Sequence, residues 1–188
     1  MALKIPVKAG AISNLTDARF FASYEVDMLG FCLDPQNENY ISPQEAQAIK
    51  AWISGPKIVA EFANQDEENV LNIIDFLQVN VIQLSADYSE QFIQQLQQKG
   101  LQIILDISTA TPDIILDVLQ IENISYYIIT ETQFEEIKIL QNKNVIVLIQ
   151  SENHLNHYPA IQLNGFKEKS TGIKLFEFEG NVLDGILE

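Results

Sequence analysis

The sequence predicts an α/β fold in which eight strands alternate with helices and close into a barrel. The first observation is a set of eight short runs rich in β-branched residues, at 4–8, 26–33, 57–62, 79–84, 101–107, 124–130, 144–149 and 160–163. These runs are mostly apolar, as strands buried on both faces of a parallel sheet must be. The second is that amphipathic segments separate them, at 15–24, 43–53, 67–78, 89–99, 112–120 and 134–141, with a last one at 175–187. This alternation favours a TIM-type (β/α)8 barrel over an open, flavodoxin-like sheet, which is the structural alternative.

Several of the predicted helices begin at recognisable capping residues. Ser42, Ser89 and Thr111 each stand immediately before a helical segment, where a side-chain oxygen can accept a hydrogen bond from a free backbone N–H. Ser42 is followed by proline at the first helical position and glutamate at the third, which is the pattern of a capping box. Gly100 fits the residue that ends the helix at 89–99.

The barrel is predicted to be shortened between its last two strands. Residues 150–159 separate these strands and include two asparagines and a proline, so a full helix with a chain reversal at each end does not fit. We therefore expect the helix between strands seven and eight to be missing or reduced to a turn. An apolar barrel surface left uncovered there would favour self-association, so a homo-oligomer is an expected partner state.

Composition predicts one domain, residues 1–188, in the cytoplasm. A hydrophobic content of 47% is sufficient for a core in a chain of this length. The longest apolar runs are far shorter than the roughly 20 residues that cross a bilayer, and no basic-then-apolar leader is visible. The one cysteine, Cys32, excludes an intramolecular disulfide and a cysteine-rich zinc cluster. We interpret Cys32 as a buried apolar residue, with a relocated catalytic thiol as the alternative.

The charge of the chain excludes two classes of partner. Lys and Arg number 11 against 26 Asp and Glu, a net charge of -15. Binding to nucleic acid or to an anionic membrane needs clustered Lys and Arg to neutralise phosphates, so neither partner is expected. A small molecule bound at the barrel mouth is the partner that remains.

The start of the chain resembles a known enzyme family. Residues 8–18 read Lys-Ala-Gly-Ala-Ile-Ser-Asn-Leu-Thr-Asp-Ala, which is similar to the Lys-Ile-Cys-Gly-Ile-Thr-x-x-x-Asp-Ala opening of phosphoribosylanthranilate isomerase, a barrel enzyme of tryptophan biosynthesis. The resemblance continues at 26–31 with Val-Asp-Met-Leu-Gly-Phe, at 40–43 with Tyr-Ile-Ser-Pro, at 59–64 and at 79–84, and it returns at 164–174. It implies the barrel fold and an intramolecular oxidoreductase-type isomerase that needs no cofactor and no metal.

The chain departs from the family at both proton-transfer positions. The family's general base, a cysteine, corresponds to Gly10, and its general acid, an aspartate, corresponds to Thr130. Glycine has no group to titrate, and a threonine hydroxyl does not act as an acid near neutral pH. Glu131, one position later, is the alternative acid, with an exposed loop carboxylate as the simpler interpretation.

The anion-binding positions of the family are also altered. The arginine that serves the substrate carboxylate corresponds to Asn39, and the His-Gly pair after the fourth strand corresponds to Ser85 and the alanine after it. A glycine loop after the seventh strand is replaced by Gln-Ser-Glu-Asn at 150–153, which puts Glu152 where a phosphate is expected. Asn164 and Gly165 keep part of the last phosphate loop and are predicted as a residual anion site.

The remaining polar groups at strand ends complete the candidate pocket. Lys8 either points into the pocket or closes the barrel interior by pairing with an acidic side chain. Asp34 and Asp106 follow the second and fifth strands and are candidates for an acid/base pair or for a solvated rim. The candidate pocket is therefore made of seven residues: Lys8, Gly10, Asp34, Asn39, Ser85, Asp106 and Thr130. His154 and His157 are interpreted as loop residues rather than as metal ligands.

Three hypotheses follow for the function, and whether the chain is an enzyme stays open among them. The first is a phosphoribosylanthranilate isomerase-like barrel without the Amadori rearrangement, a pseudoenzyme that serves as a binding or interaction protein. The second is an active isomerase with relocated catalytic residues. The third is different chemistry on a small ligand at the carboxyl ends of the strands.

Overall fold

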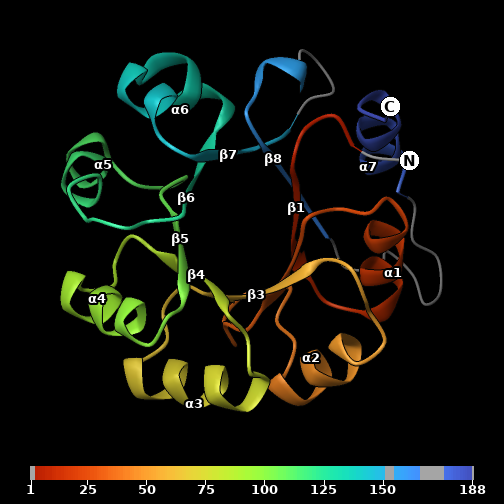
Figure 1. Ribbon diagram of the computed structural model, residues 1–188, viewed down its shortest axis with the longest axis horizontal. Coiled ribbons are helices and arrows are strands. Elements are labelled where there is room, and N and C mark those ends of the chain that lie inside the picture. Colours follow the sequence, from red (N-terminus) through yellow and green to blue (C-terminus); the bar gives the residue numbers. More distant parts are fainter. Residues whose placement is uncertain (1–2, 151–154, 166–175, 188) are drawn as a thin grey trace.

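Eight parallel strands form a closed barrel in the order β1 to β8, with helices around the outside (Figure 1). The computed structural model describes residues 3–150, 155–165 and 176–187. The strands are β1 Val7–Ile12, β2 Met28–Cys32, β3 Lys57–Phe62, β4 Val81–Ser85, β5 Gln102–Asp106, β6 Tyr126–Thr130, β7 Val145–Leu148 and β8 Ile161–Asn164. The described α-helices are α1 Leu15–Ser23, α2 Pro43–Lys50, α3 Glu67–Leu77, α4 Glu90–Gln98, α5 Pro112–Val118, α6 Glu131–Glu136 and α7 Glu177–Gly185. The predicted barrel is confirmed, and the open sheet is excluded.

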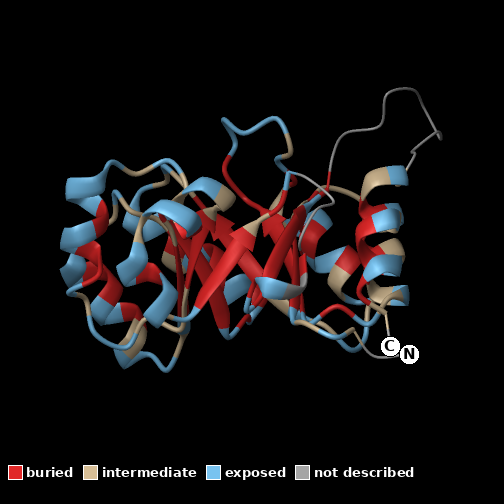
Figure 2. Cartoon of the chain, turned by 90° about the horizontal axis from the view of Figure 1, so that it is seen from above, coloured by how far each residue is buried: buried red, intermediate tan, exposed pale blue. Residues whose placement is uncertain are grey.

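Two apolar clusters hold the barrel together. The larger lies between the outer faces of the strands and the helices. Figure 2 shows buried strands at the centre of the molecule and helices on either side whose outer faces are exposed. The smaller fills the inside of the barrel and contains Met28, Val59, Val81, Ile104, Ile128, Ile146 and Ala160. Because one cluster covers each face of the sheet, the strands are apolar throughout rather than alternating. The interior cluster also closes the lower part of the barrel, so ligand chemistry is confined to the carboxyl ends of the strands.

Capping follows the sequence prediction at most helix starts. The Ser42 side chain accepts from the N–H of Glu45, and the Glu45 carboxylate accepts from the N–H of Ser42, so the capping box is formed. Ser89 accepts from the N–H of Phe92 at 3.2 Å. Thr111 makes no side-chain cap hydrogen bond, although α5 begins immediately after it with proline. Each cap that forms stabilises its helix by about 1 kcal/mol.

The connection between β7 and β8 contains no α-helix in its described residues. It forms the single 3-10 turn Leu155–His157, as the shortage of residues predicts. The expected uncovered apolar surface is absent from the described part of this region. The outward side chains of β7 and β8 are at most 2% exposed, because Leu155 and Tyr158 pack in the same apolar cluster. The prediction of an exposed patch there is therefore wrong, and self-association stays a prediction without that support.

The largest differences from the predicted element boundaries are at the first strand and the sixth helix. The first strand, expected at 4–8, is Val7–Ile12 and so includes Gly10. The helix expected at 134–141 begins at Glu131 and ends at Glu136, and a 3-10 helix, Lys138–Asn142, follows it. The first error came from treating the glycine as a strand end. The second came from missing that Thr130 and Gln133 form a capping box.

The two described ends of the chain lie side by side at the outer edge of the molecule, next to α7 (Figure 1). Leu3 forms an antiparallel bridge with Leu187, and the N–H of Lys4 donates to the carbonyl of Ile186 at 2.8 Å. No helix in the described part of the chain is long and apolar enough to span a membrane.

Candidate functional site

A polar cavity of about 220 Å³ lies at the carboxyl ends of the strands. Among the described residues that line it are the carboxylates Asp34, Glu61 and Asp106. Amide side chains and hydroxyls make up most of the remaining polar lining, namely Asn37, Gln83, Gln162, Asn164, Ser85, Ser108 and Thr109. This volume is below the range of about 300–1,000 Å³ that is usual for drug-sized ligands, so the cavity suits a small polar molecule.

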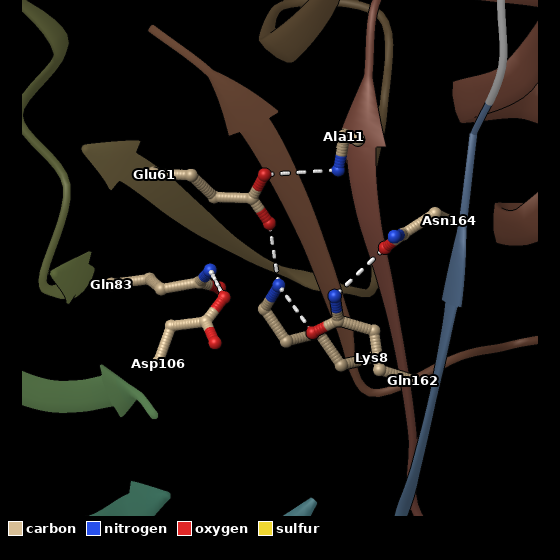
Figure 3. Close-up of polar contacts among 7 residues, drawn as sticks. All are labelled: Lys8, Ala11, Glu61, Gln83, Asp106, Gln162 and Asn164. Atoms are coloured by element: carbon tan, nitrogen blue, oxygen red, sulfur yellow. Dashed lines mark hydrogen bonds and ion pairs between the residues drawn. The ribbon is translucent and has the colours of Figure 1, made fainter. Parts of the chain in front are cut away.

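A buried ion pair between Lys8 and Glu61 forms the floor beneath this cavity (Figure 3). Lys8 is 1% exposed, and its Nζ donates to Oε1 of Glu61 at 2.5 Å and to Oε1 of Gln162 at 3.0 Å. Three strands, β1, β3 and β8, contribute these groups. Lys8 itself does not line the cavity. Of the two interpretations that the sequence allowed for Lys8, the structure shows the interior ion pair.

Gly30 leaves the space that the ion pair occupies. A Cβ atom on Gly30 would lie 1.8 Å from Oε1 of Glu61 and 3.0 Å from Nζ of Lys8. Separations this short do not occur for real side chains, so any larger residue would displace the pair. The glycine in the middle of β2 is therefore required by the contact between β1 and β3.

The second oxygen of Glu61 holds the chain at the end of β1. Oε2 of Glu61 accepts from the N–H of Ala11 at 2.9 Å. Ala11 has a φ of 53°, the left-handed region that residues with a Cβ avoid, and the register between β1 and β2 shifts between Ala9 and Ile12. This conformation costs an alanine roughly 1–2 kcal/mol. The Glu61 hydrogen bond helps to hold the strained residue in place.

The space beside Gly10 is filled by side chains from β8. A Cβ atom on Gly10 would lie 2.7 Å from Nε2 of Gln162 and 2.8 Å from Oδ1 of Asn164. These two amides bind each other, with Nε2 of Gln162 donating to Oδ1 of Asn164 at 2.7 Å. A side chain at residue 10 would therefore enter occupied space rather than an open pocket.

Asp106 stands at the centre of a second group of polar side chains. Its Oδ1 accepts from the hydroxyl of Ser108 at 2.6 Å and from the Ser108 N–H at 3.0 Å. Its Oδ2 accepts from Nε2 of Gln83 at 3.1 Å. The other polar atom of the Gln83 amide, Oε1, is buried and has no hydrogen-bond partner among the described residues.

The remaining strand-end groups lie on the rim or in the wall of the cavity. Oδ1 of Asp34 accepts from the N–H of Gln36 at 3.0 Å, and the Ser85 hydroxyl donates to the carbonyl of Ala63 at 2.8 Å. Cys32 also lines the cavity, but burial raises the pKa of its thiol to about 11. The thiol is therefore protonated near neutral pH, which disfavours a nucleophilic role.

Thr130 and Asn39 do not line the cavity. Oγ1 of Thr130 accepts from the N–H of Gln133 at 3.1 Å and caps α6. Asn39 lies in the loop between β2 and α2, and Asn37 lines the cavity in that loop instead. Thr130 therefore has a structural role as a helix cap, and Asn39 lies outside the lining of the cavity.

Glu131 binds the β7–β8 connection rather than the cavity. Its Oε2 accepts from the N–H of Gln150 at 3.1 Å, and its Oε1 accepts from the Tyr158 hydroxyl at 3.4 Å. His157 lies 3.1 Å from the Glu135 carboxylate. The described residues contain no group of three or more potential metal ligands, while Glu152 and His154 lie outside them.

The predicted residual anion site is only partly within the described residues. The N–H of Gly165 donates to the carbonyl of Gly10 at 2.7 Å, so it is already used within the protein. Asn164 accepts from Gln162 as described above. The residues that follow lie outside the described part, and an anion site at Asn164 and Gly165 stays a prediction.

Three further polar groups that shape the cavity were not predicted from the sequence, namely Glu61, Gln83 and Gln162. A signal was available, since each is a polar residue with an apolar residue on either side of it in its strand. A buried strand tolerates such a residue only where it has a polar partner or faces a cavity.

Comparisons with known proteins agree on one family. The model of the family described as N-(5'phosphoribosyl)anthranilate (PRA) isomerase matches residues 7–133. The isomerase of Thermotoga maritima is 30% identical over 101 residues, which are 53% of this chain and 49% of that protein. The isomerase of Nitrosomonas eutropha is 34% identical over 94 residues, 50% of this chain and 45% of that protein. The chain thus spans about half the length of the curated relatives it matches.

Solved structures of the same family share the fold. A phosphoribosyl anthranilate isomerase in complex with reduced 1-(o-carboxyphenylamino)-1-deoxyribulose 5-phosphate superposes with a TM-score of 0.80 at 18% identity, covering 96% of this chain and 97% of that one. The enzyme from Thermus thermophilus gives 0.76 at 19% identity, with the same coverage. With a family model that covers more than half of its residues and a closed barrel of the same architecture, this chain belongs to the phosphoribosylanthranilate isomerase family.

Proposed function

We propose that this chain is a phosphoribosylanthranilate isomerase-like barrel that does not carry out the Amadori rearrangement and that binds a small polar ligand at the barrel mouth. The observation that carries the proposal is the contact between Gly10 and β8. The position that corresponds to the family's base has no side chain, and Gln162 and Asn164 occupy the space in which one would lie. A side chain at residue 10 would therefore require these two amide groups to move.

The position of the general acid supports the same proposal. Thr130 uses its hydroxyl to cap α6, so it is engaged in helix structure rather than directed to a substrate. General acid and base groups contribute typically 10²–10⁴-fold each. Loss of both would remove most of the rate even if the substrate still bound.

The lining of the cavity argues further against the family substrate, which carries a phosphate and a carboxylate. Three carboxylates line the cavity among the described residues, and its neighbouring cation, Lys8, is paired with one of them. An anionic ligand would meet like charges there, and repulsion between like charges at short range is costly.

An isomerase assay tests the proposal directly. Purified protein is expected to convert no phosphoribosylanthranilate measurably, and its gene is not expected to rescue a tryptophan auxotroph that lacks the isomerase. A family enzyme with its cysteine and aspartate intact is the positive control. Rescue at normal expression would contradict the proposal.

An active isomerase with relocated residues is the second candidate, and it has support of its own. The curated relatives reported above carry the name of the isomerase. If activity is found, Glu61 and Asp106 are the carboxylates in the cavity that would replace the missing groups. The same two carboxylates would serve the third hypothesis, different proton-transfer chemistry on another ligand. Loss of activity in Asp106→Asn but not in Asp113→Asn, an exposed α5 residue, would identify that route.

A further inference from the structure

An unsatisfied acceptor lies in the wall of the cavity. Gln83 is 8% exposed and lines the cavity, and its Oε1 has no partner in the part of the chain that the structure describes. The orientation of its amide is set by Asp106, because a carboxylate can only accept and so must face the NH2 group of Gln83. The carbonyl oxygen is consequently the atom left over. A buried acceptor without a donor is unfavourable, and a ligand that supplies the donor removes that cost.

The groups around Gln83 also present acceptors. Oδ2 of Asp106 has Gln83 as its one partner in the described structure, although a carboxylate oxygen can accept more than one hydrogen bond. Asp34 contributes a further carboxylate, held by the N–H of Gln36. No lysine or arginine lines the cavity among the described residues, and Lys8 lies beneath it, paired with Glu61. The wall therefore favours a ligand that donates hydrogen bonds and carries positive charge.

The hydroxyl and amide groups on the other side of the cavity suit hydroxyl groups of a ligand. Thr109, Asn37 and Asn164 line it and can each both donate and accept. With a volume of about 220 Å³, the cavity fits a molecule of monosaccharide size.

We propose that the barrel mouth binds a small polyhydroxylated primary amine, with its ammonium group between Asp106 and Oε1 of Gln83 (Figure 3). This names the ligand class for the binding function proposed above and rests on it. A primary ammonium has three N–H donors, enough to bind Oε1 of Gln83 and Asp106 together. Its positive charge is attracted by the carboxylates of the cavity wall, whereas a phosphorylated or carboxylated ligand would be repelled by them.

Three six-carbon probes with the same chain of hydroxyl groups test the assignment. D-Glucamine ends in an ammonium, D-sorbitol in a hydroxyl and D-gluconate in a carboxylate, so they differ in the charge of one terminal group. Isothermal titration against the purified full chain is expected to give the order glucamine, then sorbitol, then gluconate. Charge-assisted hydrogen bonds predict an advantage of glucamine over sorbitol on the order of 10-fold. Equal binding of all three, tightest binding of gluconate, or binding of none overturns the proposal.

Two substitutions locate the ammonium group. Asp106→Asn removes the charge while keeping the side-chain shape, and it is expected to weaken glucamine binding on the order of 10-fold and sorbitol binding by much less. Gln83→Met removes the unpartnered acceptor at similar volume and is expected to weaken glucamine binding several-fold. Asp113→Asn, the same change on the exposed face of α5, is the matched control and should leave binding unchanged. Thermal unfolding of each variant verifies that it is folded.

Some outcomes separate this inference from the proposed function. If Asp106→Asn and Asp113→Asn bind glucamine equally, the ammonium does not lie at Asp106 and this assignment is wrong. Isomerase activity in the unmodified protein would contradict the proposed function whatever the probes do. Failure of the probes without isomerase activity would overturn the ligand class alone.

Discussion

Glu61 connects the buried ammonium of Lys8 to the backbone of Ala11, with one carboxylate oxygen bound to each. The same side chain thus neutralises a charge inside the barrel and fixes the turn at the end of β1.

Removal of the Glu61 carboxylate should destabilise the protein strongly. Glu61→Leu leaves Lys8 charged, buried and without its ion-pair partner, and breaking one side of a buried pair costs about 3–5 kcal/mol. Urea unfolding measures the change in free energy of unfolding. The double variant Lys8→Met/Glu61→Leu should recover much of the loss, because it removes the uncompensated charge as well. Additive losses in the double variant would show that the two residues do not act as a pair.

Ala11→Gly should stabilise the protein. Glycine adopts the φ of 53° found at residue 11 without steric cost, while the alanine is strained there. The added freedom of glycine in the unfolded chain offsets part of the gain, so the net increase in the free energy of unfolding should be on the order of 0.5–1 kcal/mol. Ala51→Gly, at the end of α2 with φ -65°, is the control and should not stabilise. A lower free energy of unfolding for Ala11→Gly would contradict the inference that Ala11 is strained.

Gly30→Ala should disrupt the ion pair from the neighbouring strand. The new methyl group would overlap with Oε1 of Glu61 and force that carboxylate to move. We expect a loss of several kcal/mol or failure to fold, since overpacking and a broken ion pair act together. Gly180→Ala, where a Cβ meets nothing within 4 Å, is the matched control and should be tolerated. Equal stability of the two variants would be inconsistent with the tight contact.

The Cys32 thiol should make stability depend on pH in the alkaline range. Burial is the main cause that raises its pKa from 9.0 to about 11. As the pH rises above 9, the unfolded chain loses this proton first and then binds fewer protons than the native state, so the free energy of unfolding falls until about pH 11. Cys32→Ser removes this contribution, so the free energy of unfolding should fall less steeply over this window than in the unchanged protein. Some dependence on pH should remain, because buried tyrosines titrate in both proteins. An identical slope in both proteins would exclude the thiol as a contributor.

Restoring the two proton-transfer residues should not restore the isomerase. In Gly10→Cys/Thr130→Asp the new thiol would enter the space of Gln162 and Asn164, and the aspartate would stand at the start of α6. Misplacement alone can cost about 10²-fold. We expect no rescue of the auxotroph until Asn39→Arg and a glycine-rich loop in place of 150–153 are added as well. Rescue by the double variant alone would mean that the anion sites are intact.

The fold could be predicted because the apolar pattern of each strand is a local property. Alternation of eight such runs with amphipathic segments leaves few arrangements other than a barrel. The connection at 150–159 likewise has too few residues for a full helix, and the 3-10 turn found in its described residues agrees with that.

The site was harder to predict because it depends on contacts between strands distant in sequence. Lys8 and Glu61 are 53 residues apart, and Lys8 and Gln162 are 154 apart. The sequence located Asp34, Ser85, Asp106 and Asn164 at the cavity, since each lies at or just after the carboxyl end of a strand. It could not show that Gln162 fills the space beside Gly10, because that requires the register of β1 against β8.

The contact between Gly10 and Gln162 couples the residues at these two positions. A cysteine at residue 10 would meet the amide of Gln162, which is already bound to Asn164, so it requires that amide to move. A smaller residue at 162 alone removes a hydrogen bond to Lys8 and leaves a gap. Each of these substitutions by itself therefore disturbs a contact in the barrel. Residues 10 and 162 thus form one unit for any redesign of the barrel mouth, since a change at either one has to be matched at the other.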